Sequence, residues 1–158
     1  MRYEMLRRLD DPLPAANDTP ATGRTPRESD LEGLAALMLD AYRGTIDDEG
    51  GTLDLARAEV ANVGRGDYGA YMPEASDVAV VGDEIVAATI VTRWRDEPLI
   101  AFSMTAATWK RRGLARASLV RALHRLRDLG ESRVRLVVTA GNEPAERLYV
   151  SLGWERVG

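Results

Sequence analysis

A basic, glycine-containing turn, Lys110-Arg-Arg-Gly-Leu-Ala115, is the first segment whose residue types could do chemistry. It follows a β-rich run, residues 99–105, and opens a long amphipathic run that predicts a helix over 114–129. The first turn of a helix leaves backbone N–H groups without partners and carries the positive end of the dipole, so it suits a phosphate. Gly113 would let the backbone approach such an anion closely. The alternative is a charged helix start that binds nothing.

The second informative segment runs from Asn142 to Trp154. A proline in its first turn and a glycine after its end predict a short helix over residues 144–152. Tyr149 on this helix carries a phenol whose ordinary pKa is about 10, so it stays protonated at neutral pH and can donate a proton. The alternatives are a core aromatic role for Tyr149 and a helix cap for Asn142.

Together the two segments resemble the signatures of the GNAT (GCN5-related N-acetyltransferase) superfamily. Lys110-Arg-Arg-Gly-Leu-Ala115 is similar to the Arg/Gln-x-x-Gly-x-Gly/Ala signature that holds the CoA pyrophosphate, and Asn142-x-Pro-Ala-x-x-Leu-Tyr149-x-x-Leu-Gly-Trp154 is similar to the second signature. The resemblance implies acetyl-CoA (CoA) as the cofactor and no metal. It also implies transfer of an acetyl group to a primary amine by direct attack in a ternary complex.

The same resemblance implies a role for each matching residue. The amides of Arg111 to Ala115 would bind the pyrophosphate, and the backbone around Thr105 would line the pantetheine arm and the thioester. Asn142 would bind the cofactor arm, and Tyr149 would be the general acid that protonates the departing thiolate. The expected cofactor-binding residues are Thr105, Ala107, Lys110, Arg111, Arg112, Gly113, Leu114, Ala115 and Asn142, and the expected catalytic residue is Tyr149.

Two features depart from the family pattern. Lys110 stands where arginine or glutamine is more common, and the predicted strand over residues 99–105 carries no acidic residue to act as a general base. The candidates for that base are Asp47, Asp48 and Glu49 in an acidic loop, Asp96 and Glu97 in a turn, or a chain of water molecules. The acidic loop favours a cationic acceptor, such as a polyamine, an amino sugar or a peptide amine.

The elements that must position these residues follow a recognisable order. Helices are expected over residues 31–43, 53–63, 114–129 and 144–152, and strands over 78–81, 84–94, 99–105, 134–139 and 154–157. The first three of these strands predict an antiparallel meander, and the almost wholly apolar fourth is expected to be covered on both faces. The pattern predicts a single α/β domain of GNAT-like fold with a mixed central β-sheet flanked by helices.

The N-terminal segment Tyr3-Glu-Met-Leu-Arg-Arg-Leu9 predicts a strand and resembles the last strand of GNAT domains, aromatic-x-Met-x-basic-x-Leu. That strand normally follows the Leu-Gly-aromatic strand, whereas this sequence ends at Gly158. We therefore expect a circular permutation: residues 1–9 take the place of the last strand, 10–23 form a linker, and 24–158 form the GNAT core. The alternative is a disordered tail beside an exposed sheet edge.

The proline-rich linker must be long enough for this arrangement. Its fourteen residues reach at most about 46–50 Å, whereas crossing five strand spacings takes about 24 Å. One chain can therefore make the connection. A linker of this length would also allow the strand to dock in a second subunit, so a strand-swapped homodimer stays open.

Composition limits the other function classes. The chain of 158 residues has no cysteine, which excludes disulfides, thiolate zinc sites and an acyl-cysteine mechanism. Its single histidine, His124, is expected to be a solvated helix residue. The net charge of −4 argues against nucleic-acid binding, and no apolar run spans a membrane, so a cytoplasmic location is expected. The competing functions are a non-catalytic acyl-CoA-binding or sensing module and an acyltransferase that uses another acyl-CoA or a hydroxyl acceptor.

Overall fold

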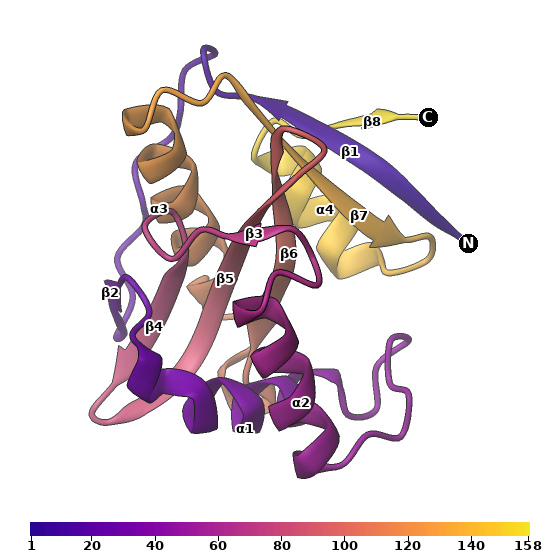
Figure 1. Cartoon of the computed structure of the whole chain (residues 1–158). Coiled ribbons are helices and arrows are strands. Elements are labelled where there is room, and N and C mark those ends of the chain that lie inside the picture. The colour runs from indigo at the N-terminus through magenta and orange to yellow at the C-terminus, as the bar shows by residue number, and fades with distance from the viewer.

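The computed structural model describes residues 1–158 and combines the β-rich segments into one eight-stranded sheet (Figure 1). The strands are β1 (Arg2–Arg8), β2 (Thr22–Arg24), β3 (Ala70–Tyr71), β4 (Asp77–Val81), β5 (Glu84–Trp94), β6 (Glu97–Thr105), β7 (Arg133–Thr139) and β8 (Glu155–Val157). Their order across the sheet is β2-β4-β5-β6-β7-β1-β8, with β3 paired to β5. Only β6 and β7 run parallel to each other, so the sheet is mixed, as expected.

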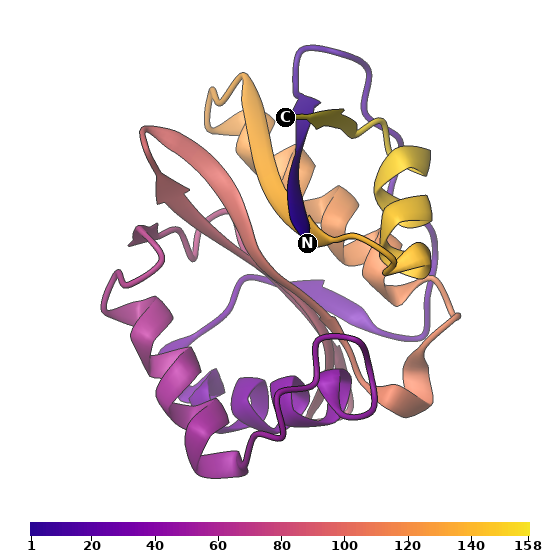
Figure 2. The same cartoon turned by 90° about the vertical axis from the view of Figure 1, so that its right-hand side faces the viewer.

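Helices cover both faces of this sheet, because each buries one apolar stripe against it. The α-helices are α1 (Leu31–Tyr42), α2 (Leu53–Gly64), α3 (Leu114–Asp128) and α4 (Glu143–Ser151), and two short 3-10 helices are η1 (Glu28–Asp30) and η2 (Ala107–Trp109). Figure 2 shows α1 and α2 on one side of β4, β5 and β6, and α3 and α4 on the other. None of the helices is long and apolar enough to cross a membrane. The predicted α/β fold with a mixed sheet and flanking helices is confirmed.

The parallel strands β6 and β7 separate soon after they meet. Only two pairs join them, Leu99 with Arg135 and Ile100 with Leu136. A shift in the register of β6 against β5 follows at once and leaves Ala101 as an extra residue, a β-bulge. Beyond the bulge the two strands diverge, so the backbone edges that they turn toward each other are not joined in a ladder (Figure 2).

The expectation that residues 134–139 are covered on both faces is wrong. Val134, Leu136 and Val138 are buried, but Val137 on the opposite face is 49% exposed. The reason is that α3 and α4 cover only one face of β7, while α1 and α2 lie over β4, β5 and β6 instead. An apolar strand therefore has one open face beside the gap between β6 and β7.

The N-terminal strand β1 docks between β7 and β8 of its own chain. It forms seven residue pairs with β7, from Arg2 with Thr139 to Arg8 with Arg133, and three pairs with β8. Tyr3 and Met5 point into the core and are buried. The predicted strand is confirmed, and the alternative of a disordered tail is wrong.

The linker between β1 and β2 lies along α3. The Pro14 carbonyl accepts a hydrogen bond from His124 Nε2 at 2.7 Å, and Asn17 Nδ2 donates to the Gly113 carbonyl at 3.2 Å. Near the other end, the backbone of Gly23 packs directly against the Arg121 side chain. His124 was expected to be a solvated helix residue; it is half-buried because it holds the linker.

Candidate functional site

The turn before α3 has the backbone geometry of an anion site. Arg111 and Gly113 adopt left-handed φ angles of 65° and 78°, and α3 begins at Leu114. No side chain caps the helix, and its first turn has no acidic residue. The N–H groups at the start of α3 therefore point outward without a capping partner, as anion binding requires. A left-handed arginine is itself costly, by roughly 1–2 kcal/mol, and such strain is common at ligand sites.

The three basic side chains of this turn have different surroundings. Lys110 Nζ donates to the Ala41 carbonyl at 3.0 Å, so this side chain ties the turn to the end of α1. The Arg112 guanidinium lies over the Trp109 ring, 4.8 Å from its centroid. Arg111 and Arg112 are exposed and supply the positive charge at the surface of the turn.

Two of the expected cofactor residues already have neighbours in the protein. The Ala107 N–H donates to Asp40 Oδ2 at 2.7 Å, so this amide is engaged by α1. A Cβ on Gly113 would lie 2.7 Å from Asn17 Nδ2, so the glycine also makes room for the linker. The Asn17 Oδ1 atom is buried without a partner. Sequence reasoning missed Asn17, because the linker carries no motif that predicts where it docks.

Tyr149 lies on α4 and is only 9% exposed. Burial raises the pKa of Tyr149 above its ordinary value, the Ser103 side chain partly opposes this rise, and Asp47 adds to it. The ring also packs beside Trp154, with the centroids 6.1 Å apart. Ser103 belongs to the part of β6 that has separated from β7, so the buried, protonated phenol faces the diverging strands.

Asn142 precedes α4 at the N-cap position. Its side chain makes no capping hydrogen bond, so the interpretation of its side chain as a helix cap is wrong. Glu146 accepts the N–H of Gly141, the residue before Asn142, at 3.1 Å and so ties the preceding loop to the helix. The side-chain amide of the half-buried Asn142 therefore has no role in capping α4.

One of the five acidic candidates for the base, Asp47, lies near enough to Tyr149 for its charge to raise the pKa of that phenol. Its Oδ1 accepts a hydrogen bond from Thr139 Oγ1, at the end of β7, at 2.8 Å. Burial raises the pKa of Tyr42, at the end of α1, and both Tyr149 and Asp47 add to that rise. The structure thus gathers Tyr42, Asp47, Thr139 and Tyr149 where β7 ends.

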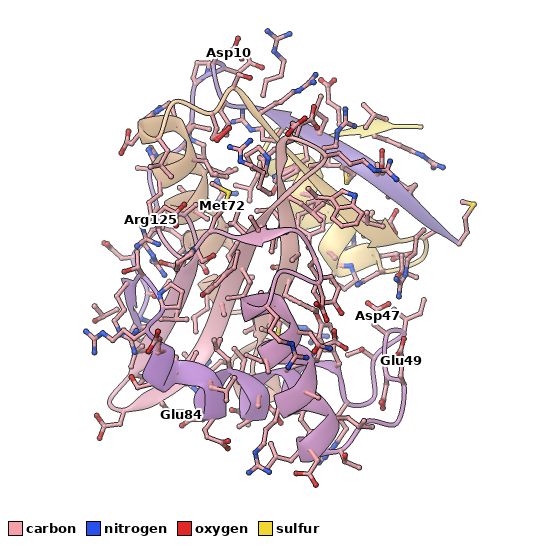
Figure 3. All side chains as sticks on the ribbon, in the orientation of Figure 1. Asp10, Asp47, Glu49, Met72, Glu84 and Arg125 are labelled. Carbon is pink, nitrogen blue, oxygen red and sulfur yellow. The ribbon has the colours of Figure 1, made fainter.

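The other four acidic candidates lie elsewhere. Asp48 accepts the N–H groups of Gly44 and Gly50, so it shapes its own loop. Figure 3 shows Glu49 on the outer side of that loop, with Asp47 nearer to the end of β7. Asp96 and Glu97 stand at the start of β6, about 20 Å along the strand from Ser103. Sequence reasoning could not choose among the five, because only the packing of the loop on β7 separates them.

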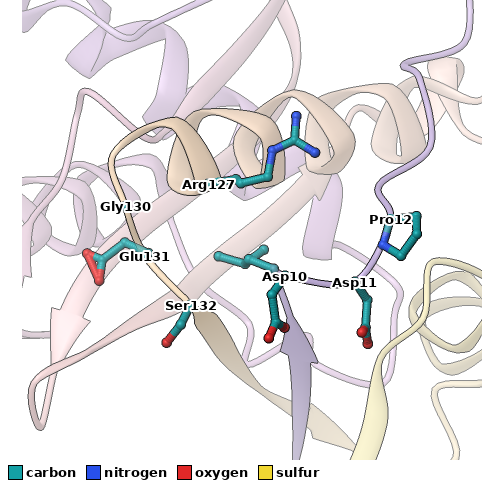
Figure 4. Close-up of a pocket in the computed structure, with 8 residues that line it drawn as sticks. Asp10, Asp11, Pro12, Arg127, Gly130, Glu131 and Ser132 are labelled. Atoms are coloured by element: carbon teal, nitrogen blue, oxygen red, sulfur yellow. The ribbon is translucent and has the colours of Figure 1, made fainter.

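A hollow of about 390 Å³ lies at the far end of α3 (Figure 4). Asp10, Asp11 and Glu131 line it together with a single basic residue, Arg127. This set of charges repels phosphates, and the length of α3 places it about 22 Å from Gly113. The hollow is therefore separate from the turn that suits a pyrophosphate.

A sheet that opens between two parallel strands, with an uncapped helix start at the opening, defines an α/β fold with a site suited to a phosphate-bearing ligand. The family model described as the Acetyltransferase (GNAT) family matches residues 34–154. The chain therefore belongs to the GNAT acetyltransferase family.

Solved structures share this fold at low sequence identity. The GCN5-related N-acetyltransferase from Sphaerobacter thermophilus matches with a TM-score of 0.78 and 22% identity, over 99% of this chain and 48% of that one. AAC(6')-Iy, solved in complex with the bisubstrate analog CoA-S-monomethyl-acetylneamine, matches with a TM-score of 0.64 and 14% identity, over 85% of this chain and 90% of that one. The chain thus spans about half of the Sphaerobacter protein.

A curated relative matches over a shorter segment. Mycothiol acetyltransferase from Thermobifida fusca (strain YX) is 49% identical over 47 residues, which make up 30% of this chain and 15% of that protein. The match supports the assignment to an acetyltransferase family and covers too little of the relative to carry its substrate.

Proposed function

We propose that the protein is an acetyl-CoA-dependent N-acetyltransferase that transfers the acetyl group to a primary amine by direct attack in a ternary complex. One observation carries the proposal: the uncapped start of α3, the separated edges of β6 and β7, Tyr149 and Asp47 all lie at the same end of the sheet. Ligands of open α/β sheets bind at the carboxyl ends of their parallel strands, and these groups lie at those ends of β6 and β7.

The cofactor would be held mainly by the backbone. The amides of Arg111 to Ala115 would bind the pyrophosphate, and the separated edge of β6 near Thr105 would line the pantetheine arm and the thioester. The side chain of Asn142 would bind the cofactor arm. The left-handed turn, the missing cap of α3 and the unpaired strand edge support this arrangement. Ala107 and Lys110 would shape the site through their hydrogen bonds to α1.

Two side chains would move the protons. Acetyl-CoA, when bound, supplies a thioester that an amine can attack. Asp47 would accept the first proton of the incoming ammonium, and Tyr149 would donate its phenolic proton to the departing thiolate. The second proton, which the nitrogen loses as the amide forms, would restore the phenol. A phenol with a raised pKa keeps that proton at neutral pH. Burial also makes a thiolate more basic, which favours the transfer inside the site.

The acceptor would be a small-molecule or peptide amine that is cationic in solution. The carboxylate of Asp47 beside the buried Tyr149 and the half-buried Tyr42 favours such a charge. The names of the relatives describe those proteins' own substrates and ligands, and they do not identify one amine for this chain.

Release of free thiol from acetyl-CoA in the presence of an amine panel tests the proposal directly. The protein contains no cysteine, so a thiol reagent reports only the CoA that is released. Amine-dependent release supports an N-acetyltransferase. Tight binding of acetyl-CoA without release for any amine would instead indicate a non-catalytic binding module. Release that is faster with a longer acyl-CoA would point to a different acyl donor.

We also propose that β1 stands in the place of the family's last strand, through a circular permutation with residues 10–23 as the linker between β1 and the core, residues 24–158. Its position between β7 and β8 supports this relation. The same pairs form if β1 crosses to a second copy, so the molecular mass in solution distinguishes a monomer from a strand-swapped homodimer. A cytoplasmic location without nucleic-acid or membrane partners stays a prediction from composition.

A further inference from the structure

A cavity of about 470 Å³ lies between α1, α2 and the sheet. Ten of its fifteen lining residues are hydrophobic; they include Leu34, Met38, Val60, Ile90, Phe102 and Met104. Cavities of this size with a mainly apolar lining are typical of sites for small organic ligands. None of these side chains takes part in the cofactor turn or in the proton transfers proposed above.

The cavity borders the candidate active site through two elements. On β6, Phe102 and Met104 flank Ser103, and side chains alternate between the two faces of a strand. Ser103 therefore faces Tyr149, while its two neighbours face the cavity. On α1, Met38 lies about 6 Å, roughly one turn, before Tyr42. The inner end of the cavity is thus one helical turn from the cluster that contains Asp47.

We propose that this cavity binds the apolar body of the acceptor, so that the substrate is an amphiphilic primary amine with its ammonium group at Asp47. The inference rests on the proposed acetyltransferase function and narrows its substrate class. An apolar lining has few partners for the hydroxyl groups of an amino sugar or the inner amines of a polyamine, and burying these groups without partners is costly. The lining therefore favours an alkyl or aromatic amine.

The charges around the cavity favour an acceptor over an acyl chain. At the outer end the exposed residues Arg27 and Glu28 line the opening, so a ligand can enter from solvent. Beyond the inner end, about one helical turn past Met38, the carboxylate of Asp47 is complementary to an ammonium group. The acyl chain of a longer acyl-CoA carries no charge that Asp47 could bind. It would also have to reach the cavity from the thioester, not through the opening at Arg27 and Glu28.

The first test compares primary alkylamines of increasing length with acetyl-CoA in excess. Each methylene buried in the cavity should raise kcat/KM by up to about fourfold from ethylamine to hexylamine. Ala61→Phe places a bulky ring in the cavity and should lower kcat/KM for hexylamine at least tenfold more than for ethylamine. Ala58→Phe, on the exposed side of the same helix, is the matched control and should preserve the preference.

The second test locates the ligand without using activity. The chain has five methionines, of which only Met38 and Met104 line the cavity. In the protein labelled with ¹³C at the methionine methyl groups, hexylamine should shift those two signals and leave those of Met1, Met5 and Met72 unchanged. Spermidine should shift none of the five. Met38→Leu and Met104→Leu assign the two signals.

Several outcomes would overturn the inference. Rates that do not depend on chain length, or equal shifts of all five methionine signals, would show that the cavity does not select the acceptor. If Ala61→Phe lowers the use of hexanoyl-CoA and leaves hexylamine unaffected, the cavity holds the acyl chain instead. If no amine releases thiol, the proposed function fails, and the hexylamine titration still decides whether the cavity binds an apolar amine.

Discussion

The cofactor side of the candidate site is formed mainly by the main chain, whereas the acceptor side is formed by side chains. The cofactor side consists largely of backbone: a left-handed turn through Arg111 and Gly113, an uncapped helix start and an unpaired strand edge. The acceptor side consists of side chains: Asp47 beside a buried and a half-buried tyrosine, and the lining of an apolar cavity. Unusual backbone needs particular residues at fixed spacing and so leaves a motif, whereas many sequences can line a cavity.

This difference predicts that the two sides respond separately to substitution. Changes at the start of α3 should weaken binding of acetyl-CoA with little effect on the choice of amine. Changes at Asp47 or in the cavity should alter use of the amine with little effect on cofactor affinity.

The largest effect is expected for Tyr149→Phe, which removes the proton donor and keeps the ring. General acid catalysis contributes about 100- to 10,000-fold, so kcat should fall at least about 100-fold. The dissociation constant of acetyl-CoA should change less than about threefold in calorimetry, because the ring still packs beside Trp154. Tyr3→Phe, which removes a phenol that donates a hydrogen bond to Glu146 on the same helix as Tyr149, is the control and should retain kcat. Equal kcat in wild type and Tyr149→Phe would remove Tyr149 from the mechanism.

A smaller effect is expected for Asp47→Asn, which removes the charge that would receive the ammonium. We expect kcat/KM for the amine to fall about 10- to 100-fold at neutral pH. The loss should shrink as the pH approaches the pKa of the amine, because a neutral amine needs no deprotonation before it attacks. Glu49→Gln, on the outer side of the same loop, should have no such effect. A defect that is equal at all pH values would assign Asp47 to loop structure only.

A modest effect is expected for Asn17→Ala, which removes the contact between the linker and the phosphate turn. Loss of one hydrogen bond of about 1 kcal/mol should weaken acetyl-CoA binding roughly fivefold. Turnover of acetyl-pantetheine, which lacks the pyrophosphate, should be unchanged. Asp18→Ala, at an exposed neighbouring position, provides the control. Equal losses with both acyl donors would show that Asn17 supports the fold generally.

The last prediction concerns stability at alkaline pH rather than activity. Burial raises the pKa of Tyr42 and Tyr149, and burial raises the pKa of Tyr71 to about 12. Above pH 10 these tyrosines ionise in the unfolded chain while they stay protonated in the folded one, so unfolding releases protons. The free energy of unfolding should fall by up to about 1.4 kcal/mol per pH unit for each of them.

Denaturant titrations between pH 8 and pH 11.5 measure this slope. Tyr42→Phe should reduce the slope of the unfolding free energy against pH by about the contribution of one tyrosine, because phenylalanine does not titrate. A slope that is identical in wild type and Tyr42→Phe would contradict the assignment of a raised pKa to Tyr42.

Much of the fold and part of the site could be predicted from the sequence. Apolar periodicity predicted α3, and the glycines at 130 and 153 predicted where the last two helices end. The resemblance of residues 3–9 to a last strand predicted the pairing of β1 with β7 and β8. These features depend on local residue types, which a sequence displays directly.

The remaining features depend on contacts between distant segments. The bulge at Ala101 has no residue signature, and the docking of Asn17 on Gly113 joins residues 96 positions apart. In the sequence Asp47 cannot be distinguished from Asp48 and Glu49, because only the contact of its loop with Thr139 at the end of β7 separates them. The open face at Val137 follows from where the helices pack, and an apolar run alone cannot predict which strand is left half covered.

The central claim is that the start of α3 binds the pyrophosphate of acetyl-CoA, and calorimetric titration of two variants tests it most directly. Ala115 is the second residue of α3, where a glutamate favours the helix dipole and so preserves the fold. Its charge would also repel the pyrophosphate, so Ala115→Glu should weaken acetyl-CoA binding at least about 100-fold, whereas the neutral Ala115→Gln of similar size should stay within about fivefold of wild type. Equal affinities for the two variants, or no binding by the wild type, would contradict the account.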